Sequence, residues 1–379
     1  MSDLVGTTAL VRLALRRDRV LLPLWLAVFA VSAGSSASAT VGLYPTESSR
    51  VEAAAGINGT PSLVALYGEI YDPTSIGALA MIKLGGLGGA LVAVLATVVV
   101  VRHSRAEEEA GRLELLGSTV VGRSAPLAAA AVVAVLTNLA LGLVTAVSLS
   151  AAGLPGPGSL AFGLAWAGTG IAFAAVAAVA AQLTTGARAA TATTSAVLGL
   201  AYLLRAVGDT ASPNGPRWAS WLSPVGWGQQ TRPFAGDRWW VLLLPVAFTL
   251  AVGAGAFVLA ARRDLGAGLL ADRPGASSAA PGLRSPLALA WRLHRTSLLG
   301  WAAGFVVLGL VFGNVASSIG SLLDSPQSQD LFRKLGGEKG LTDAFLATEV
   351  GFIGVFASVF GVQAAMRLRS EETALRAEP

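Results

Sequence analysis

The chain contains no cysteine and only 2 histidines among its 379 residues. Without cysteine it has no disulfide framework, no thiolate nucleophile and no cysteine-based metal site. Charged residues are scarce as well, at 13%, whereas water-soluble domains carry roughly a quarter. Hydrophobic residues make up 54%, and the mean hydropathy is +0.65. These shortages exclude a disordered chain, a coiled coil and an ordinary cytosolic enzyme. They predict an all-α, polytopic helical membrane protein.

Sequence motifs typical of enzymes are missing too. The chain has no G-x-x-x-x-G-K-S/T motif, and indeed no Gly-Lys pair, so it has no P-loop with which to bind ATP. It has no H-E-x-x-H and no G-x-S-x-G motif. His103 and His294 lie at the ends of apolar runs among arginines, a setting that favours an interfacial role over metal binding. We therefore expect a protein that is not an enzyme and has no catalytic, cofactor-binding or metal-binding residues.

Eight apolar segments reach the length of roughly 20 residues that a helix needs to cross a bilayer. They are residues 22–44, 76–101, 125–151, 160–183, 188–207, 240–260, 298–323 and 344–366.

Basic residues indicate how these segments are oriented. Arginine and lysine are more frequent in the connecting segments that become cytoplasmic when the N-terminus is inside. We therefore predict a multi-pass protein of the cell membrane with a cytoplasmic N-terminus. The net charge of +5 is spread between apolar runs, which argues against a nucleic-acid partner. The strong preference for arginine over lysine favours a bacterial genome of high GC content.

An internal repeat links two charged stretches, residues 101–115 and 365–379. Both follow an apolar span, and five charged residues recur in the same spacing. Transporters are often built from duplicated halves. We therefore predict that residues 1–275 form a first half with six spans, and that residues 276–379 begin a second, incomplete half. The chain then resembles a C-terminally truncated piece of a two-times-six-span protein. In the repeat, Arg105, Glu107, Glu108, Arg112 and Glu114 correspond to Arg369, Glu371, Glu372, Arg376 and Glu378.

Two interpretations of the first charged stretch are open. It is either a solvated loop, stabilised by an i, i+4 pair between Glu108 and Arg112, or a rigid helix on which a soluble partner docks. The repetition of the pattern, and Gly111 within it, favour docking.

The stretch Glu107-Glu-Glu-Ala-Gly-Arg-Leu-Glu-Leu-Leu-Gly-Ser-Thr-Val-Val-Gly-Arg123 resembles the segment after the second span of type-2 ABC exporter permeases. The chain looks closest to actinobacterial antibiotic exporters of the tetronasin and polyketide type. It departs from the family pattern at Val120–Arg123, where many members have a proline before the basic residue.

The resemblance implies that residues 105–123 form a coupling helix that contacts a separate ABC ATPase subunit, which acts as a dimer and binds the ATP. It also implies amphipathic elbow helices at residues 5–20 and 284–297. The expected function is export of a lipophilic antibiotic or drug-like compound across the lipid bilayer. The coupling candidates are Arg105, Glu107, Glu108, Gly111, Arg112, Glu114, Arg123, Arg369, Glu371, Glu372, Arg376 and Glu378.

An alternative function is a secondary transporter, driven by ions or protons, or a channel without an ATPase. Such a machine needs charged groups within its helices, and two residues qualify: Lys83 and Glu349. They occupy near-equivalent depths in the two copies of the repeat. Either they face each other across the pathway as a gate, or each extends separately to the membrane surface.

Overall fold

A computed structural model of the chain describes residues 3–117, 119–212, 215–270, 278, 282–283, 285–321 and 337–373. These residues form helices, turns and irregular segments, and none of them is in a strand, which confirms the all-α prediction. The chain divides into two compact units, unit 1 (Met1–Arg273) and unit 2 (Pro274–Pro379). Each unit is described by itself.

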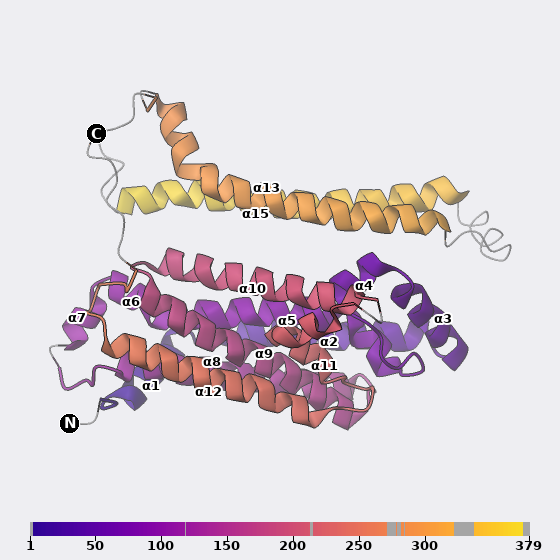
Figure 1. Ribbon diagram of the computed structural model, residues 1–379, viewed down its shortest axis with the longest axis horizontal. Coiled ribbons are helices and arrows are strands. Elements are labelled where there is room, and N and C mark those ends of the chain that lie inside the picture. The colour runs from indigo at the N-terminus through magenta and orange to yellow at the C-terminus, as the bar shows by residue number, and fades with distance from the viewer. Residues whose placement is uncertain are drawn as a thin grey trace. The chain divides into compact units, whose positions relative to one another are not determined.

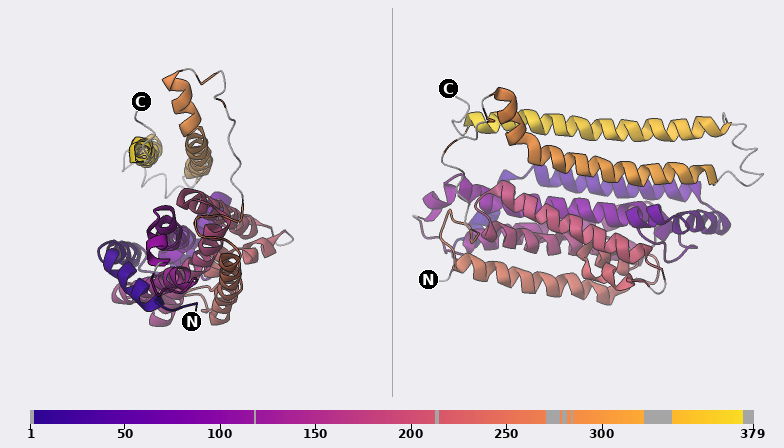
Figure 2. Two further views of the ribbon diagram at one scale, coloured as in Figure 1. Left: turned by 90° about the vertical axis from the view of Figure 1, so that its left-hand side faces the viewer. Right: turned by 45° about the horizontal axis from the view of Figure 1, so that its top comes forward.

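Six helices among the described residues are long and apolar enough to cross a membrane, and all six belong to unit 1. They lie at the first six predicted spans and run side by side (Figure 1 and Figure 2). The total of eight spans stays a prediction. The six are α2 (Leu21–Leu43), α5 (Ile76–His103), α8 (Ala125–Ala151), α9 (Gly156–Leu183), α10 (Ala187–Thr210) and α12 (Leu243–Ala261), which follows a 3₁₀ turn, η2 (Trp239–Leu242).

Helix α9 forms the centre of unit 1. In its most apolar window 72% of the residues are buried, against 17% in α12. The buried positions of α9 are mostly alanine and glycine, which allow neighbouring backbones to approach closely. A Cβ atom added at Gly142 of α8 would lie 2.5 Å from the carbonyl oxygen of Gly163 of α9, so this approach requires glycine. The stability of unit 1 therefore depends on small residues in α8 and α9.

Short helices gather at the two ends of this bundle (Figure 1). One end, which we call the charged end, holds three of them: α1 (Thr7–Arg17), α6 (Arg105–Glu109) and α7 (Arg112–Gly117). The opposite end, which we call the pocket end, holds α3 (Glu47–Asn58), α4 (Pro61–Tyr67), the 3₁₀ helix η1 (Arg217–Leu222) and α11 (Pro224–Gln230).

The two predicted elbow segments differ in structure. The first contains α1, which ends at Arg17, and α2 starts anew at Leu21 with Pro23 in its first turn, where proline is tolerated. Residues 286–297 of the second elbow segment form the first part of α13, which runs over Pro286–Ser321 and bends near its start (Figure 1), and their role as an elbow stays a prediction. No proline follows Pro286 within α13, so nothing in the sequence interrupts its backbone hydrogen bonds.

Unit 2 is described as a pair of helices, α13 and α15 (Gly337–Thr373). Helix α15 extends beyond the predicted span 344–366 at both ends. The indole nitrogen of Trp301 donates a hydrogen bond of 2.7 Å to the side-chain oxygen of Gln363, which connects the two helices.

Candidate functional site

The charged segment, residues 105–123, forms two short helices and an irregular stretch instead of the single helix predicted. Gly111 separates α6 from α7 with a φ of +70°, a left-handed conformation that favours glycine. After α7 the backbone is held by residues that precede α1. The amide of Gly122 donates to the carbonyl of Val5 at 2.8 Å, and that of Ser124 donates to Asp3 at 3.1 Å. Because these bonds join the segment to the N-terminal residues, the helix cannot continue to Arg123.

Glu107 connects the charged segment to α1. Its carboxylate accepts hydrogen bonds from Arg17 at the end of α1 and from Nε of Arg112, the latter at 2.6 Å. The i, i+4 pair of Glu108 with Arg112 expected for a solvated loop is therefore not formed. Arg112 pairs with Glu107, and Glu108 faces the interior.

Glu108 is the most buried of the three consecutive glutamates, with 5% of its side chain exposed. Its Oε1 accepts from Nη1 of Arg263 at 2.5 Å and from the amide of Gly266 at 2.6 Å. Its Oε2 accepts from Nη2 of Arg263 at 2.7 Å and forms an ion pair of 2.8 Å with Nη1 of Arg105. Both oxygens thus have charged donors, as a buried carboxylate requires.

Arg105 extends this network to the ends of two membrane helices. Its side chain is fully buried and donates to the carbonyl of Thr184, which caps α9, and to that of Ala267 at 2.9 Å, beyond α12. Arg263 donates from Nε to the side-chain oxygen of Gln182 in α9 at 2.7 Å. The charged segment therefore holds the ends of α9 and α12 together.

Glu109 reaches a fourth helix. Its Oε2 accepts a hydrogen bond of 2.9 Å from the amide of Ala187, the first residue of α10. A carboxylate at a helix N-terminus is favoured by the unpaired amides and by the helix dipole. Glu107, Glu108 and Glu109 thus point to different elements, and the segment is fixed in place. The side chains of Arg112, Glu114 and Arg123 remain exposed at its surface.

A second buried carboxylate stabilises the same end. Asp18, between α1 and α2, is 1% exposed and accepts from Nε of Arg102 at 3.0 Å. It also forms a hydrogen bond of 2.6 Å with Nε2 of His103. His103 thus joins the end of α5 to the α1–α2 turn.

At the pocket end, Arg205 and Asp209 of α10 form a buried pair, with Nη1 and Oδ2 3.5 Å apart. Arg205 is fully buried and donates to the carbonyls of Ala65 and Leu66 in the last turn of α4. Asp209 accepts a hydrogen bond of 2.9 Å from the hydroxyl of Ser220 in η1. The pair therefore fastens two short helices of the pocket end to α10.

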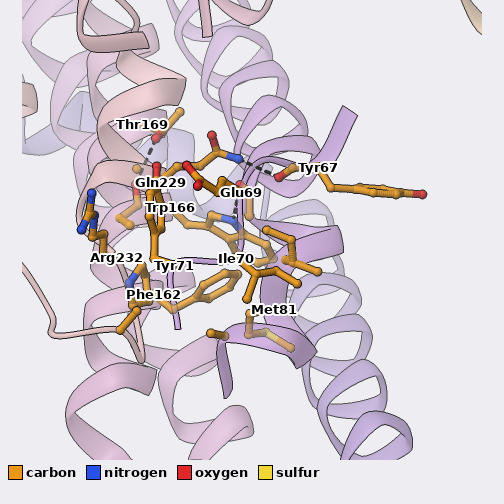
Figure 3. Close-up of a pocket in the computed structure, with 17 residues that line it drawn as sticks. Tyr67, Glu69, Ile70, Tyr71, Met81, Phe162, Trp166, Thr169, Gln229 and Arg232 are labelled. Carbon is orange, nitrogen blue, oxygen red and sulfur yellow. Dashed lines mark hydrogen bonds between the residues drawn. The ribbon is translucent and has the colours of Figure 1, made fainter. Parts of the chain in front are cut away.

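A pocket opens at the same end of the bundle (Figure 3). Gln229 closes one wall by donating to the carbonyl of Tyr67 at 2.7 Å. The guanidinium of Arg232 lies over the ring of Tyr71, 4.1 Å from its centroid. The other lining residues are largely apolar or aromatic, and they include Ile70, Met81, Ile82, Phe162 and Trp166, with Glu69 among them.

Comparison with known proteins identifies the family. A family model described as "Multidrug efflux system permease Rv1217c, C-terminal domain" matches residues 283–379. The chain is also 47% identical, over all 379 residues, to the multidrug efflux system permease protein Rv1217c of Mycobacterium tuberculosis, and it covers 68% of that protein. The chain belongs to this permease family. Its six long apolar helices agree with a membrane permease.

The predicted coupling residues of this permease fall into two groups. Arg105, Glu107 and Glu108 are engaged in ion pairs within unit 1, so their charges serve its internal structure. The exposed residues are Arg112, Glu114 and Arg123. Of these, Arg112 also pairs with Glu107, and Arg123 donates to the carbonyl of Arg263 at 2.7 Å.

The second copy of the repeat is described only in part. Arg369, Glu371 and Glu372 belong to the C-terminal part of α15, where the side chain of Glu372 is exposed. Arg376 and Glu378 lie outside the described residues. The coupling role of the second copy stays a prediction.

The two gate candidates lie in different units. Lys83 is exposed on α5. Glu349 belongs to α15, and its side chain lies outside the described ones. Their pairing stays a prediction.

Sequence reasoning missed three acidic groups of unit 1: Asp18, Glu69 and Asp209. Asp209 had a readable signal, because an aspartate four residues after an arginine within an apolar helix indicates an internal pair. Asp18 and Glu69 lie in connecting segments, where a charged residue is ordinary and gives no such signal.

Proposed function

We propose that this chain is the membrane-spanning permease subunit of an ATP-driven ABC exporter. A single observation carries the proposal: the charged segment is bonded to α1, α9, α10 and the residues after α12, so a force applied to it reaches several membrane helices. Arg112 and Glu114 stand exposed on its surface, where an ATPase subunit can contact them.

Because this sequence contains no P-loop motif, we propose that the ATP is bound by a separate subunit, a dimeric ABC ATPase. The charged end and the N-terminus then face the cytoplasm. The named relative is a multidrug efflux permease, which supports drug-like substrates for this chain too. We propose a lipophilic antibiotic or related compound, in keeping with the resemblance to polyketide-type exporters.

The test reverses an exposed charge on the docking surface. Glu114 makes no ion pair among the described residues, so Glu114→Lys should leave the fold unchanged and repel a basic contact on the ATPase. We expect at least a roughly ten-fold loss of ATPase association and of ATP-dependent efflux, as for truncation at a charged interface. Glu52→Lys, exposed on α3 at the pocket end, is the matched control and should retain both activities.

Two results would overturn the proposal. One is normal association and efflux by Glu114→Lys together with Arg112→Glu. The other is efflux that persists after ATP depletion and stops when a protonophore is added, which would establish the secondary transporter instead. Glu108 does not serve as a test position, because its substitution disrupts the internal network.

A further inference from the structure

Glu69 differs from the buried carboxylates elsewhere in unit 1. It is half-buried in the wall of the pocket, and it makes no hydrogen bond or ion pair with any described residue. Asp18, Glu108 and Asp209, by contrast, all accept bonds from nitrogen or hydroxyl donors. A carboxylate beside apolar side chains loses hydration and gains nothing in return unless a partner arrives. The Glu69 carboxylate therefore lacks a hydrogen-bond donor among the described residues.

The arginine that lines the pocket does not pair with Glu69. Arg232 lines the same pocket, but its guanidinium lies over the ring of Tyr71 and forms no ion pair with Glu69. Figure 3 shows Glu69 among the rings of the pocket, close in the view to Gln229 and Trp166. Gln229 donates one of its two amide hydrogens to the carbonyl of Tyr67 and forms no hydrogen bond with Glu69.

Two carboxylates and Arg232 act on the ionisation of Tyr71, which lines the pocket. Burial raises the pKa of the Tyr71 phenol above its usual value, and the negative charges of Asp209 and Glu69 raise it further. Arg232 lowers this pKa, but its effect is smaller than that of either carboxylate. The negative groups thus dominate the potential at the Tyr71 hydroxyl.

The remaining walls fit the apolar groups of an organic cation. Met81 of α5 and Phe162 and Trp166 of α9 present hydrophobic and aromatic surface, and the two rings lie 4.7 Å apart between centroids. Aromatic faces attract organic cations, and a nearby carboxylate adds a direct charge interaction. An apolar pocket with few polar groups is the usual form of a small-molecule site.

We propose that this pocket binds lipophilic organic cations, with the cationic centre beside the Glu69 carboxylate and the apolar groups against Phe162 and Trp166. The role of the pocket in export rests on the exporter function proposed above, for which it names a substrate class. Binding itself requires neither ATP nor an ATPase.

Two probes of matched shape and opposite charge test the proposal: tetraphenylphosphonium and tetraphenylborate. The purified full chain in an uncharged detergent is titrated with each, and the saturable part of binding is measured. We expect the cation to bind at least about ten-fold more tightly than the anion, and Glu69→Gln to raise the Kd of the cation by a similar factor. Arg232→Gln should lower the Kd of the cation, because it removes a competing positive charge.

Control variants separate charge from folding. Glu69→Asp keeps the charge and should retain most of the preference for the cation, and Glu52→Gln should leave it unchanged. Equal binding of both probes to the wild-type chain, tighter binding of the borate, or an unchanged Kd in Glu69→Gln would overturn the proposal. Because no ATP is present, a failure of ATP-dependent export would not affect this result. Loss of charge preference in a chain that still exports would overturn the pocket proposal alone.

Discussion

Two buried arginines lie at opposite ends of unit 1, and their surroundings are closely parallel. Arg105 at the charged end and Arg205 at the pocket end are 1% and 0% exposed. Each pairs with a carboxylate one turn further along its own helix, and each donates to carbonyl groups at the C-terminal end of another helix. A guanidinium has several donors in a rigid plane, so it can join a carboxylate and free helix carbonyls at once.

The carboxylates make the difference between the two ends. Glu108 receives four contacts of 2.5–2.8 Å, which include two guanidinium groups. Asp209 receives one hydrogen bond, from Ser220, and its other oxygen lies 3.5 Å from Arg205. Glu108 is therefore held by more and shorter contacts than Asp209, which suits the charged segment to transmit force to the helices it contacts.

The largest expected effect comes from the charged end. Glu108→Gln leaves two buried guanidinium groups without their shared anion, so we expect a loss of about 3–5 kcal/mol in stability. Thermal unfolding in detergent measures the loss, and amide hydrogen exchange should rise over 105–117 and 262–270. Glu114→Gln is the control, since its side chain is exposed. Unchanged exchange at 262–270 would show that Glu108 does not connect the segment to α12.

A smaller effect is expected at the pocket end. Asp209→Asn keeps an acceptor for Ser220 but takes the anion from Arg205, which retains its two carbonyl acceptors. Because the ion pair removed is single and long, the expected loss is about 1–3 kcal/mol. Hydrogen exchange should rise in α4 and η1 and not at the charged end. Ser220→Ala, which removes the hydroxyl donor alone, should cost less. A loss of stability equal to that of Glu108→Gln would show that the two carboxylates contribute equally, contrary to the difference in their contacts.

The smallest effect is expected at Glu109, an exposed residue of the charged end. Glu109 is exposed and contacts the α10 amide, so Glu109→Gln should cost about 0.3–1 kcal/mol through the helix dipole. This cost should shrink at high salt, which screens exposed charges. The measurement is thermal unfolding at low and high ionic strength. A loss of stability that does not depend on salt would mean that Glu109 acts through packing.

Much of the fold was predictable from the sequence, because it depends on local properties. A run of apolar residues long enough for a bilayer predicts a helix wherever it occurs, and the first six predicted spans coincide with helices of unit 1. The helix break at Gly111 could have been predicted, since glycine adopts positive φ at little cost. The continuous α13 was not predicted, because the basic residues at its start suggested a separate interfacial helix.

The repeated charges singled out residues 105–123 before the structure was known, and the role of this segment as a docking surface stays a prediction. The i, i+4 spacing offered Arg112 as a partner for Glu108 in the solvated-loop alternative, and this pair is not formed. The partners of Glu108, Arg263 and Gly266, are far away in the sequence, and no local pattern specifies them. For the same reason the pocket around Glu69 could not be foreseen.

Composition alone identifies a helical membrane protein, and the lack of a P-loop motif can be read directly from the sequence, because a motif is a contiguous run of residues. The role of each charge depends instead on the packed structure. Three adjacent glutamates bind three different elements, whereas Glu69 accepts no hydrogen bond from any residue that the structure describes. The physical reason is that an apolar interior penalises every unpaired charge, so the role of a charged residue depends on which donors the packed helices bring within reach.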